Sequence, residues 1–403
     1  MPYQITSLEL SEPLDALSIG PADSGLALIL RYHDRPIGFI MRSIEPNTTL
    51  STEQLSEWIT PAVGEQLLKE KISAQLQPEL QPVKFPSLSI AICTRDRPES
   101  LQRCLLALLP LQIPHNPVFE IVVVDNAPSD QRTYELVKTF PSVRYTAEPK
   151  PGISFARNHA LQMATGELLA FLDDDTVVDP QWLKGLQTAF FENPDAGGFT
   201  GLVLPYELES EAQILFENRG GFRRGFEKIR YGQQLLGNPL YPCGAGIFGA
   251  GCNMAFRRLL LLELGGFDNV LGTGRPTQGG EDLDIFYRVI RAGYPFVYEP
   301  SYVIYHQHRR EMLKLRRQYQ GWGTGLMAFL TKSYQSDPPM RSRFVKLVAW
   351  WFRYQLRMLA SSLKGNARSL PAGMILAEIW GGVTGLLGVY GRSRRQMAAI
   401  QQR

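Results

Sequence analysis

A short apolar run that ends in three carboxylates constrains the fold of this chain more than any other stretch. Residues 168–172 read LLAFL, short enough for a strand buried on both faces, and Asp173, Asp174 and Asp175 follow at once. In open α/β sheets ligands bind outside the carboxyl ends of strands, where carboxylates can hold a divalent cation and, through it, phosphate. The stretch therefore indicates a site, with a solvated acidic turn as the competing interpretation.

Strand and helix patterns alternate around this run. Strands are expected at 88–93, 121–124 and 143–146, with helical segments between them. Such alternation predicts an α/β fold whose central sheet is mostly parallel, with helices on both faces. Asp125 directly follows the second strand, so two strands end in carboxylates at one edge of the sheet. Asp179 and Pro180 resemble the N-cap and first residue of the next helix.

The segment from 206 to 308 adds further candidates. Residues 206–245, rich in Gly, Arg and aromatics, are expected to form a long irregular segment. The loop LGTGRPTQGG then ends at Glu281 and Asp282, where glycines let the backbone approach a ligand closely; complementing a helix dipole is the alternative role for these acids. Strands are expected at 296–299 and 302–306. If the second continues, His306 and His308 share a face and either could reach a metal, while packing is the competing role.

The first 85 residues predict a small module of unassigned role. Two β-rich runs, 26–31 and 37–44, suggest a hairpin. Ser51 and Gln54 form a capping box for a helix to about residue 76, with an interruption expected at Pro61. Prolines at 78, 82 and 86 mark a linker.

Basic charge is concentrated at the C-terminus. Residues 341–403 carry eleven Lys and Arg and one acid, Glu378, a balance of +10 that leaves −7 for the rest of a chain of net charge +3. In the segment from residue 344 to residue 364, the cations Lys346, Arg353, Arg357 and Lys364 lie on one face of an expected helix. Tryptophans and leucines cover much of the remainder, which predicts a helix in a membrane interface beside anionic lipid. No recognition motif accompanies the cations, so nucleic acid is not an expected partner.

Residues 371–391 are apolar apart from Glu378. An interfacial or re-entrant helix is favoured, because Glu378 and positive charge at both ends count against crossing; packing on the α/β domain and a true span are the alternatives. The four cysteines lack metal spacing and are expected as buried thiols in a reducing compartment. No secretory signal is recognised at the N-terminus. The expected location is therefore cytoplasmic, peripheral on the inner face of the cytoplasmic membrane.

Seven segments together resemble the inverting family-two glycosyltransferases of the GT-A fold. In chain order they are SIAICTRDRPESLQRCL, EIVVVDNAPSD, PGISFARNHAL, GELLAFLDDDTVVDPQWL, GAGCNMAFRR, GGFDNVLGTG and GGEDLDIFYR. The resemblance covers about residues 87–310. It implies a nucleotide-sugar half at 87–200 and an acceptor and catalytic half at 200–310, between the 1–85 module and a basic helical segment at 311–403.

The resemblance also implies roles for matching residues. Asp282 would be the catalytic base, with Glu281 beside it. Asp175 would bind Mn²⁺ or Mg²⁺, with Asp173 and His306 as further ligands. The implied donor-binding residues are Thr94, Arg95, Asp96, Arg97, Asp125, Asn126, Arg157, Asn158, Asp173 and Asp174. Of these, Arg157 and Asn158 could equally form a structural ion pair and cap. The implied acceptor-binding residues are Gly251, Asn253 and Gly280.

The implied activity is transfer of a sugar from a nucleotide-diphosphate sugar to a saccharide or lipid-linked acceptor, in surface polysaccharide or glycan synthesis. A divalent ion can stabilise a departing diphosphate, so the chemistry needs a base and no general acid. The alternatives are a nucleotidyltransferase acting on sugar phosphates and a catalytically inactive binding protein of the same fold. A dehydrogenase is disfavoured, because CTRDRP stands where G-x-G-x-x-G would be required.

Overall fold

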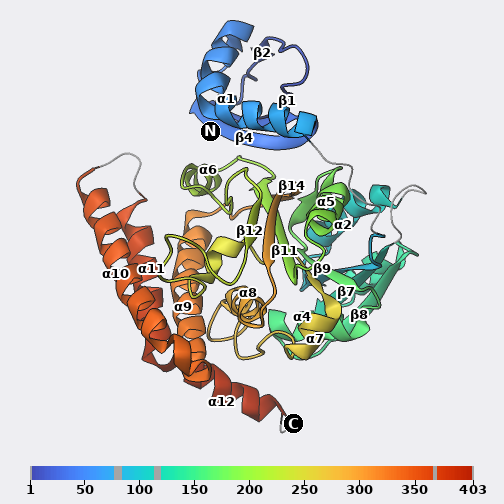
Figure 1. Cartoon of the computed structure of the whole chain (residues 1–403), viewed down its shortest axis with the longest axis vertical. Coiled ribbons are helices and arrows are strands. Elements are labelled where there is room, and N and C mark those ends of the chain that lie inside the picture. Colours follow the sequence, from blue (N-terminus) through green and yellow to red (C-terminus); the bar gives the residue numbers. More distant parts are fainter. Residues whose placement is uncertain (1, 77–83, 113–118, 366–369, 402–403) are drawn as a thin grey trace.

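The computed structural model describes residues 2–76, 84–112, 119–365 and 370–401. Figure 1 shows an N-terminal module at one end, a central α/β body, and C-terminal helices along one side of that body. The expected linker prolines at 78 and 82 lie outside the described residues.

The N-terminal module is a small sheet covered by one helix. Its strands are β1 (Gln4–Glu9), β3 (Gly25–Tyr32) and β4 (Arg35–Ser43), while β2 (Leu17–Ser18) pairs with β5 (Thr49–Leu50). Strands β3 and β4 form the predicted hairpin, and the Ser51–Gln54 capping box precedes α1 (Thr52–Leu76). The helix continues through Pro61 without the expected interruption. Leu55, Ile59 and Val63 hold its inner face in the module core on both sides of that proline.

The central sheet has nine strands in the order β10-β14-β11-β13-β9-β6-β7-β8, with β12 beside β14. The strands are β6 (Leu88–Thr94), β7 (Phe119–Asn126), β8 (Val143–Glu148), β9 (Leu168–Asp173), β10 (Thr176–Val178), β11 (Gly198–Pro205), β12 (Ile229–Tyr231), β13 (Asn253–Arg257) and β14 (Phe296–His306). Strands β6, β7, β8, β9, β11 and β14 run in one direction, which confirms the predicted α/β class with a mostly parallel sheet.

Two features of this sheet differ from the sequence prediction. Strand β13 lies antiparallel between β9 and β11, although NMAFR directly precedes an apolar helix and carries no strand signal of its own. The two strands expected at 296–299 and 302–306 are one strand, β14. Its pairing with β11 is irregular between Gly201 and Val203, so the break in the sequence pattern is a bulge.

Helices cover both faces of the sheet. They are α2 (Pro98–Leu108), α3 (Arg132–Lys138), α4 (Ile153–Met163), α5 (Trp182–Glu192), α6 (Glu211–Asn218), α7 (Arg258–Glu263) and α8 (Glu281–Arg291). Alternate residues of β9 enter two separate cores: Leu169 and Phe171 one, Leu168 and Leu172 the other. The run that opened the sequence is therefore buried on both faces, as predicted.

Two helices, α6 and α5, differ from the sequence prediction. Residues 206–245 contain α6, which a capping box between Ser210 and Gln213 begins. Helix α5 begins two residues beyond Pro180. The Asp179 carboxylate is buried and accepts hydrogen bonds from Arg31, from the Tyr305 hydroxyl and from the Gln181 backbone. Asp179 thus joins the N-terminal module to the central sheet.

The C-terminal helices are α9 (Met312–Ser336), α10 (Arg341–Leu363), α11 (Ala372–Thr384) and α12 (Tyr390–Gln401), which confirms the predicted helical segment. Short 3₁₀ turns occupy 109–111, 245–248 and 338–340, and a π-helical turn occupies 385–389. Helix α11 packs closely on α9, where Gly323 and Gly381 bring the two backbones together. Residues 371–384 therefore pack on the protein along one face. The helical stretch Ala372–Ile400 is nevertheless long and apolar enough to cross a membrane by length and composition, with 39% of its most apolar window buried.

Candidate active site

The carboxyl ends of three adjacent strands bring together the first group of predicted residues. Thr94 at the end of β6 pairs with Asp125 on β7, and Cys93 pairs with Asp173 at the end of β9. Parallel strands in register end at one edge, which is why residues about 80 positions apart meet there. The structure thus places Thr94, Asp125 and Asp173 side by side, as the sequence indicated.

Strand β14 brings a histidine to this edge from the second half of the chain. Its last residue, His306, pairs with Thr176 of β10, directly after the acidic triplet. Asp173, Asp175 and His306 each offer a ligand atom, and these atoms all lie within 4.8 Å of one another. Burial lowers the pKa of His306 to about 4, so its ring is neutral and can donate a lone pair.

This cluster fits a divalent cation. Two carboxylates and one imidazole are common ligands of divalent metal ions. Asp175 is buried and its Oδ1 accepts no hydrogen bond from the described residues, although His306 Nε2 lies 3.4 Å away. A buried carboxylate oxygen without a hydrogen donor is costly unless a cation or ligand meets it. Asp173, Asp175 and His306 are therefore the residues that could hold a metal.

Asp174 is not part of this cluster. Its Oδ2 accepts a hydrogen bond of 2.6 Å from the Thr94 hydroxyl, and its Oδ1 lies 2.6 Å from the Arg97 guanidinium. Burial raises the pKa of Asp174 to about 7. Arg97 also reaches Asp175 at 2.9 Å, so these contacts tie the β6 and β9 ends together.

Two further donor candidates, Asp125 and Asn126, lie at the end of β7. Asp125 is buried and accepts a hydrogen bond from the Tyr145 hydroxyl, while its Oδ1 has no partner in the described part of the chain. Burial raises the pKa of Asp125. By contrast, Asn126 is occupied by the backbone of Lys150 and Gly152, where it orders the turn before α4. Asp125 therefore keeps a buried carboxylate oxygen without a hydrogen-bond donor, whereas Asn126 supports the structure.

The loop after β6 holds Arg95 and Asp96. The Asp96 carboxylate accepts hydrogen bonds of 2.9 Å from the backbone and hydroxyl of Ser129. Arg95 is half exposed and pairs with Asp96 at 3.6 Å. The loop is thereby fixed against the segment that follows β7.

Arg157 is the buried link between the two halves of the site. One guanidinium nitrogen lies 3.1 Å from Glu281 Oε1, and the other lies 3.4 Å from Asp173 Oδ1 and donates to the Gly251 carbonyl. The structural ion pair considered for this residue is therefore present. Burial, together with the neighbouring Asp282, raises the pKa of Glu281 to about 7, against the opposing charge of Arg157.

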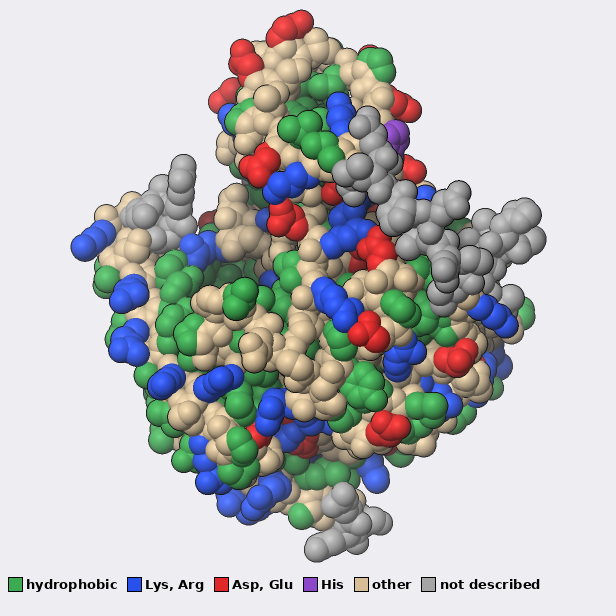
Figure 2. Space-filling model, viewed as in Figure 1, with side chains coloured by type: hydrophobic (Ala, Val, Ile, Leu, Met, Phe, Trp, Pro, Cys, Tyr) green, Lys and Arg blue, Asp and Glu red, His purple; other side chains and the backbone are tan. Residues whose placement is uncertain are grey.

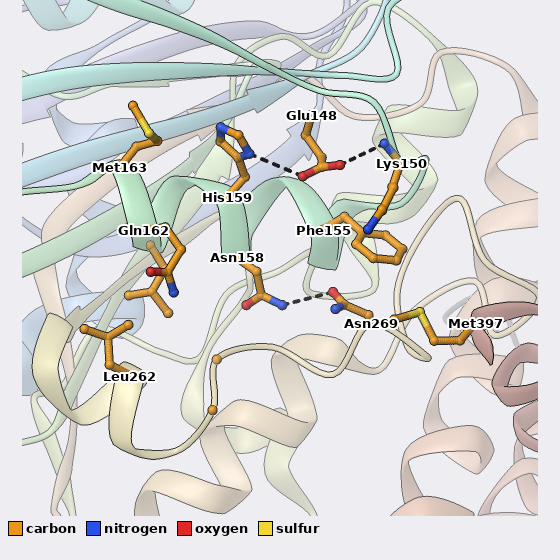
Figure 3. Close-up of a pocket in the computed structure, with 13 residues that line it drawn as sticks. Glu148, Lys150, Phe155, Asn158, His159, Gln162, Met163, Leu262, Asn269 and Met397 are labelled. Atoms are coloured by element: carbon orange, nitrogen blue, oxygen red, sulfur yellow. Dashed lines mark hydrogen bonds and ion pairs between the residues drawn. The ribbon is translucent and has the colours of Figure 1, made fainter. Parts of the chain in front are cut away.

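Asn158 does not join this cluster. Its amide donates to the Phe267 carbonyl and to Asn269, and its Oδ1 accepts from the Phe267 backbone. Figure 3 shows Asn158 and Asn269 beside a separate pocket that Lys150, Phe155 and His159 also line. Asn158 therefore clamps the loop after α7, which corresponds to the structural alternative.

Asp282 is the second residue of α8 and is partly exposed. Its Oδ1 accepts a hydrogen bond from the Leu283 backbone. A side chain at Gly251 would bring a Cβ to 3.1 Å from Asp282 Oδ2, so glycine leaves this carboxylate oxygen accessible. Gly280 has φ 92° and lies against the Gly325 backbone of α9, where a Cβ would clash.

Asn253 is placed differently from the prediction. It is fully buried on β13, its Oδ1 accepts from the Trp182 indole, and its amide nitrogen donates to the Tyr302 carbonyl. Both ends of the amide are thus used inside the core, and no group remains for an acceptor. Asn253 has no part in the function proposed below.

Two further residues support His306. His308 Nδ1 lies 3.1 Å from His306 Nδ1, and His308 Nε2 lies 2.7 Å from Glu217 Oε1 on α6. His308 was the alternative metal ligand, and the structure turns it toward Glu217. The capping box of Ser210 and Gln213 was the sequence signal that could have predicted α6, the helix that carries Glu217. Arg309, also unpredicted, lies 3.8 Å from Asp175.

Comparison with known proteins identifies the domain that carries this site. Residues 89–261 match the model of the family described as Glycosyl transferase family 2. The chain carries a glycosyl transferase family 2 domain. Strands β7 to β13 and all but the first residue of β6, with Asp125 and the acidic triplet, lie within the matched residues, whereas Asp282 and His306 follow them.

Two curated relatives of this chain carry names that describe glycan synthesis. Glucosyl-dolichyl phosphate glucuronosyltransferase of Haloferax volcanii is 25% identical over 200 residues, 47% of this chain and 57% of that protein. Succinoglycan biosynthesis protein ExoM of Rhizobium meliloti is 30% identical over 220 residues, 53% of this chain and 64% of that protein. The chain thus matches less than two thirds of each relative's length.

A solved structure with a similar fold is the mannosyltransferase PcManGT of Pyrobaculum calidifontis, in complex with GDP-Man and Mn²⁺. It is 19% identical, with a TM-score of 0.47, and the alignment covers 83% of this chain and 91% of that one.

Proposed function

We propose that this family 2 chain is a metal-dependent, inverting glycosyltransferase that moves a sugar from a nucleotide-diphosphate sugar to a saccharide or lipid-linked acceptor. The observation that carries the proposal is the position of Arg157. Its guanidinium contacts Asp173 in the cation cluster and Glu281 beside Asp282. One buried side chain therefore links a carboxylate of the candidate metal cluster to the residue that precedes the candidate base.

The proposed mechanism assigns a separate task to each group. Asp173, Asp175 and His306 would hold Mn²⁺ or Mg²⁺, which stabilises charge on the diphosphate leaving group when bound. Asp125, through its unpartnered Oδ1, accepts a hydrogen bond from the nucleoside of the donor. Asp282 removes the proton of the acceptor hydroxyl as that oxygen attacks the anomeric carbon. The bond to the diphosphate breaks on the opposite face, so the configuration at that carbon inverts.

A screen of sugar nucleotides tests this activity. At least one donor is expected to release nucleoside diphosphate when Mn²⁺ is supplied, and to release none when the metal is chelated. Release of pyrophosphate from a nucleoside triphosphate and a sugar phosphate would instead identify a nucleotidyltransferase. Absence of both reactions with every donor would leave the inactive binding protein and contradict the proposal.

We further propose that the C-terminal helices lie on the inner face of the cytoplasmic membrane. On α10, Val345, Leu356 and Leu363 are more than half exposed and share one stripe. Lys346, Arg353 and Arg357 form an adjacent row, and Figure 2 shows basic and hydrophobic side chains interspersed along this side of the molecule. This arrangement supports contact with anionic lipid. The four cysteines are buried and free, which agrees with a reducing compartment.

Vesicle flotation tests the membrane contact. A cation near an anionic surface contributes about 1 kcal/mol, so replacing Lys346, Arg353, Arg357 and Lys364 together by Gln is expected to weaken binding to phosphatidylglycerol vesicles by about 10³-fold. The matched control replaces four exposed cations of the nucleotide-sugar half, Arg132, Lys138, Arg144 and Lys184, and should float like the unmodified chain. Equal flotation of both variants, or no flotation of the unmodified chain, would contradict the proposal.

A further inference from the structure

A second pocket lies between α6, α9, α10 and α11, outside the cluster described above. Its volume is about 250 Å³, less than the roughly 300–1,000 Å³ of pockets that enclose drug-sized ligands, and suits a ligand of about one ring. Six aromatic side chains line it: Phe216, Tyr319, Trp322, Trp350, Trp351 and Tyr354.

Three polar side chains lie among these rings. Glu378 is the only acid in residues 341–403, and it accepts a hydrogen bond from Gln355, which is 4% exposed. Arg219 also lines the pocket. Burial raises the pKa of Glu378 to about 7, and the positive charge of Arg219 opposes this shift. A carboxyl, an amide and a guanidinium offer donors and acceptors in planar arrays. Aromatic faces with such groups beside them match a pyranose ring, which has apolar C–H faces and hydroxyls around its edge.

One layer of aromatic rings separates this pocket from the candidate metal site. Phe216 and Trp322 pack on Phe222, with ring centroids 5.1 and 5.8 Å away. Phe222 packs in turn on His306, with centroids 5.1 Å apart. A ligand in the pocket would therefore lie close to the reacting centre without occupying it. Such a position suits a sugar of the acceptor that is remote from the reacting one.

The order of side chains around α10 favours a sugar over a lipid chain. At about 100° per residue, the cations Lys346, Arg353 and Arg357 lie roughly 80–120° from the exposed apolar stripe that begins at Val345. Trp350 and Tyr354, at the pocket, lie at about 140–180° by the same count. The cationic row thus separates the pocket mouth from the apolar stripe. If the apolar stripe of α10 lies on a lipid surface, the mouth of the pocket therefore faces water.

We propose that this pocket binds one pyranose ring of a saccharide acceptor. The assignment rests on the proposed glycosyltransferase function and deepens it, since it makes a saccharide chain the acceptor class. It also gives Glu378 a role as a hydrogen-bonding group for sugar hydroxyls.

Direct binding of methyl pyranosides tests the assignment. The probes are the methyl glycosides of glucose, galactose, mannose, N-acetylglucosamine and glucuronic acid, measured on the full chain by saturation-transfer NMR and tryptophan fluorescence. At least one is expected to bind, and Trp350→Ala and Glu378→Gln are each expected to weaken that binding at least tenfold. Trp350 is half exposed and Glu378→Gln preserves shape, so both variants should fold. Trp380→Ala, an exposed tryptophan of α11 outside the pocket, is the matched control and should bind like the unmodified chain.

The outcomes separate this assignment from the proposed activity. Binding of no methyl pyranoside, or binding insensitive to both substitutions, overturns the assignment. Decyl phosphate that binds in its place, with the same sensitivity to Trp350→Ala, also overturns it and makes the pocket a lipid site. If the unmodified chain releases nucleoside diphosphate from a sugar nucleotide while no pyranoside binds, the pocket assignment fails and the proposed function stands. If a pyranoside binds but no donor is cleaved, the pocket is a saccharide site and the proposed glycosyltransferase function fails.

Discussion

Asp282→Asn is expected to lower the rate of sugar transfer by about 10²–10⁴-fold, the usual contribution of a positioned general base. Asparagine keeps the size of the side chain and can still accept the hydrogen bond from the Leu283 backbone, but it cannot take a proton. Asp282 has no contact with the candidate metal ligands, so the affinity for nucleoside diphosphate with Mn²⁺ should change little. Calorimetric titration of that ligand, beside the transfer rate, separates the two effects.

The control for this substitution is Asp195→Asn, which changes an exposed carboxylate that pairs with Arg230 far from the strand ends. It should leave both quantities unchanged. A collapse of donor affinity in Asp282→Asn would make Asp282 a binding residue. Full transfer in that variant would remove it as the base, and Glu281, whose pKa burial raises to about 7, would then be the next residue to replace.

Asp175→Asn is expected to abolish metal-dependent turnover and to weaken Mn²⁺ binding by more than about 100-fold. The reason is that Asn replaces an anionic ligand by a neutral one, and loss of a mere supporting partner already costs about 10–100-fold. Mn²⁺ affinity is measured by electron paramagnetic resonance without any sugar nucleotide, so the result does not depend on activity. Full metal-dependent turnover in this variant would contradict the assignment.

The neighbouring Asp174→Asn is the matched control for the metal assignment. Asp174 is just as buried, but it bonds to Thr94 and Arg97 and is not part of the cluster. Its replacement is expected to lower thermal stability, because Arg97 loses one of its two carboxylate partners, while Mn²⁺ affinity changes only a few-fold. An equal loss of Mn²⁺ affinity in both variants would show that the triplet acts as a unit.

The candidate base and the proposed acceptor pocket share one support, helix α9. Gly325 of this helix lies against the backbone of Gly279 and Gly280, just before Glu281 and Asp282, and Trp322 lines the pocket one turn earlier. The opposite contact of α9, through Gly323, is with α11, which carries Glu378. Close backbone packing on both sides therefore fixes the loop before α8 relative to the pocket.

Local patterns predicted the parts of the site that depend on strand ends. A buried apolar run followed by Asp173, Asp174 and Asp175, and another followed by Asp125, are visible without any knowledge of long-range contacts, because parallel strands bring their carboxyl ends to one edge. The glycine-rich loop before Glu281 and Asp282 was also visible in the sequence, because glycines directly before two carboxylates are a local pattern. The same reasoning missed β13, whose five residues form a strand only because β9 and β11 lie on either side of it.

The sequence alone determined that this chain forms an α/β sheet with acids at its carboxyl edge, since burial of alternating segments and the residue after each strand are local properties. Only the tertiary structure decided which acid does what. Asp174 is turned toward Thr94 and Arg97, while the pairing of β10 with β14 brings His306 to Asp173 and Asp175. The aromatic pocket likewise exists only where four helices meet. Contacts between residues far apart in the sequence create such sites, and no local pattern specifies those contacts.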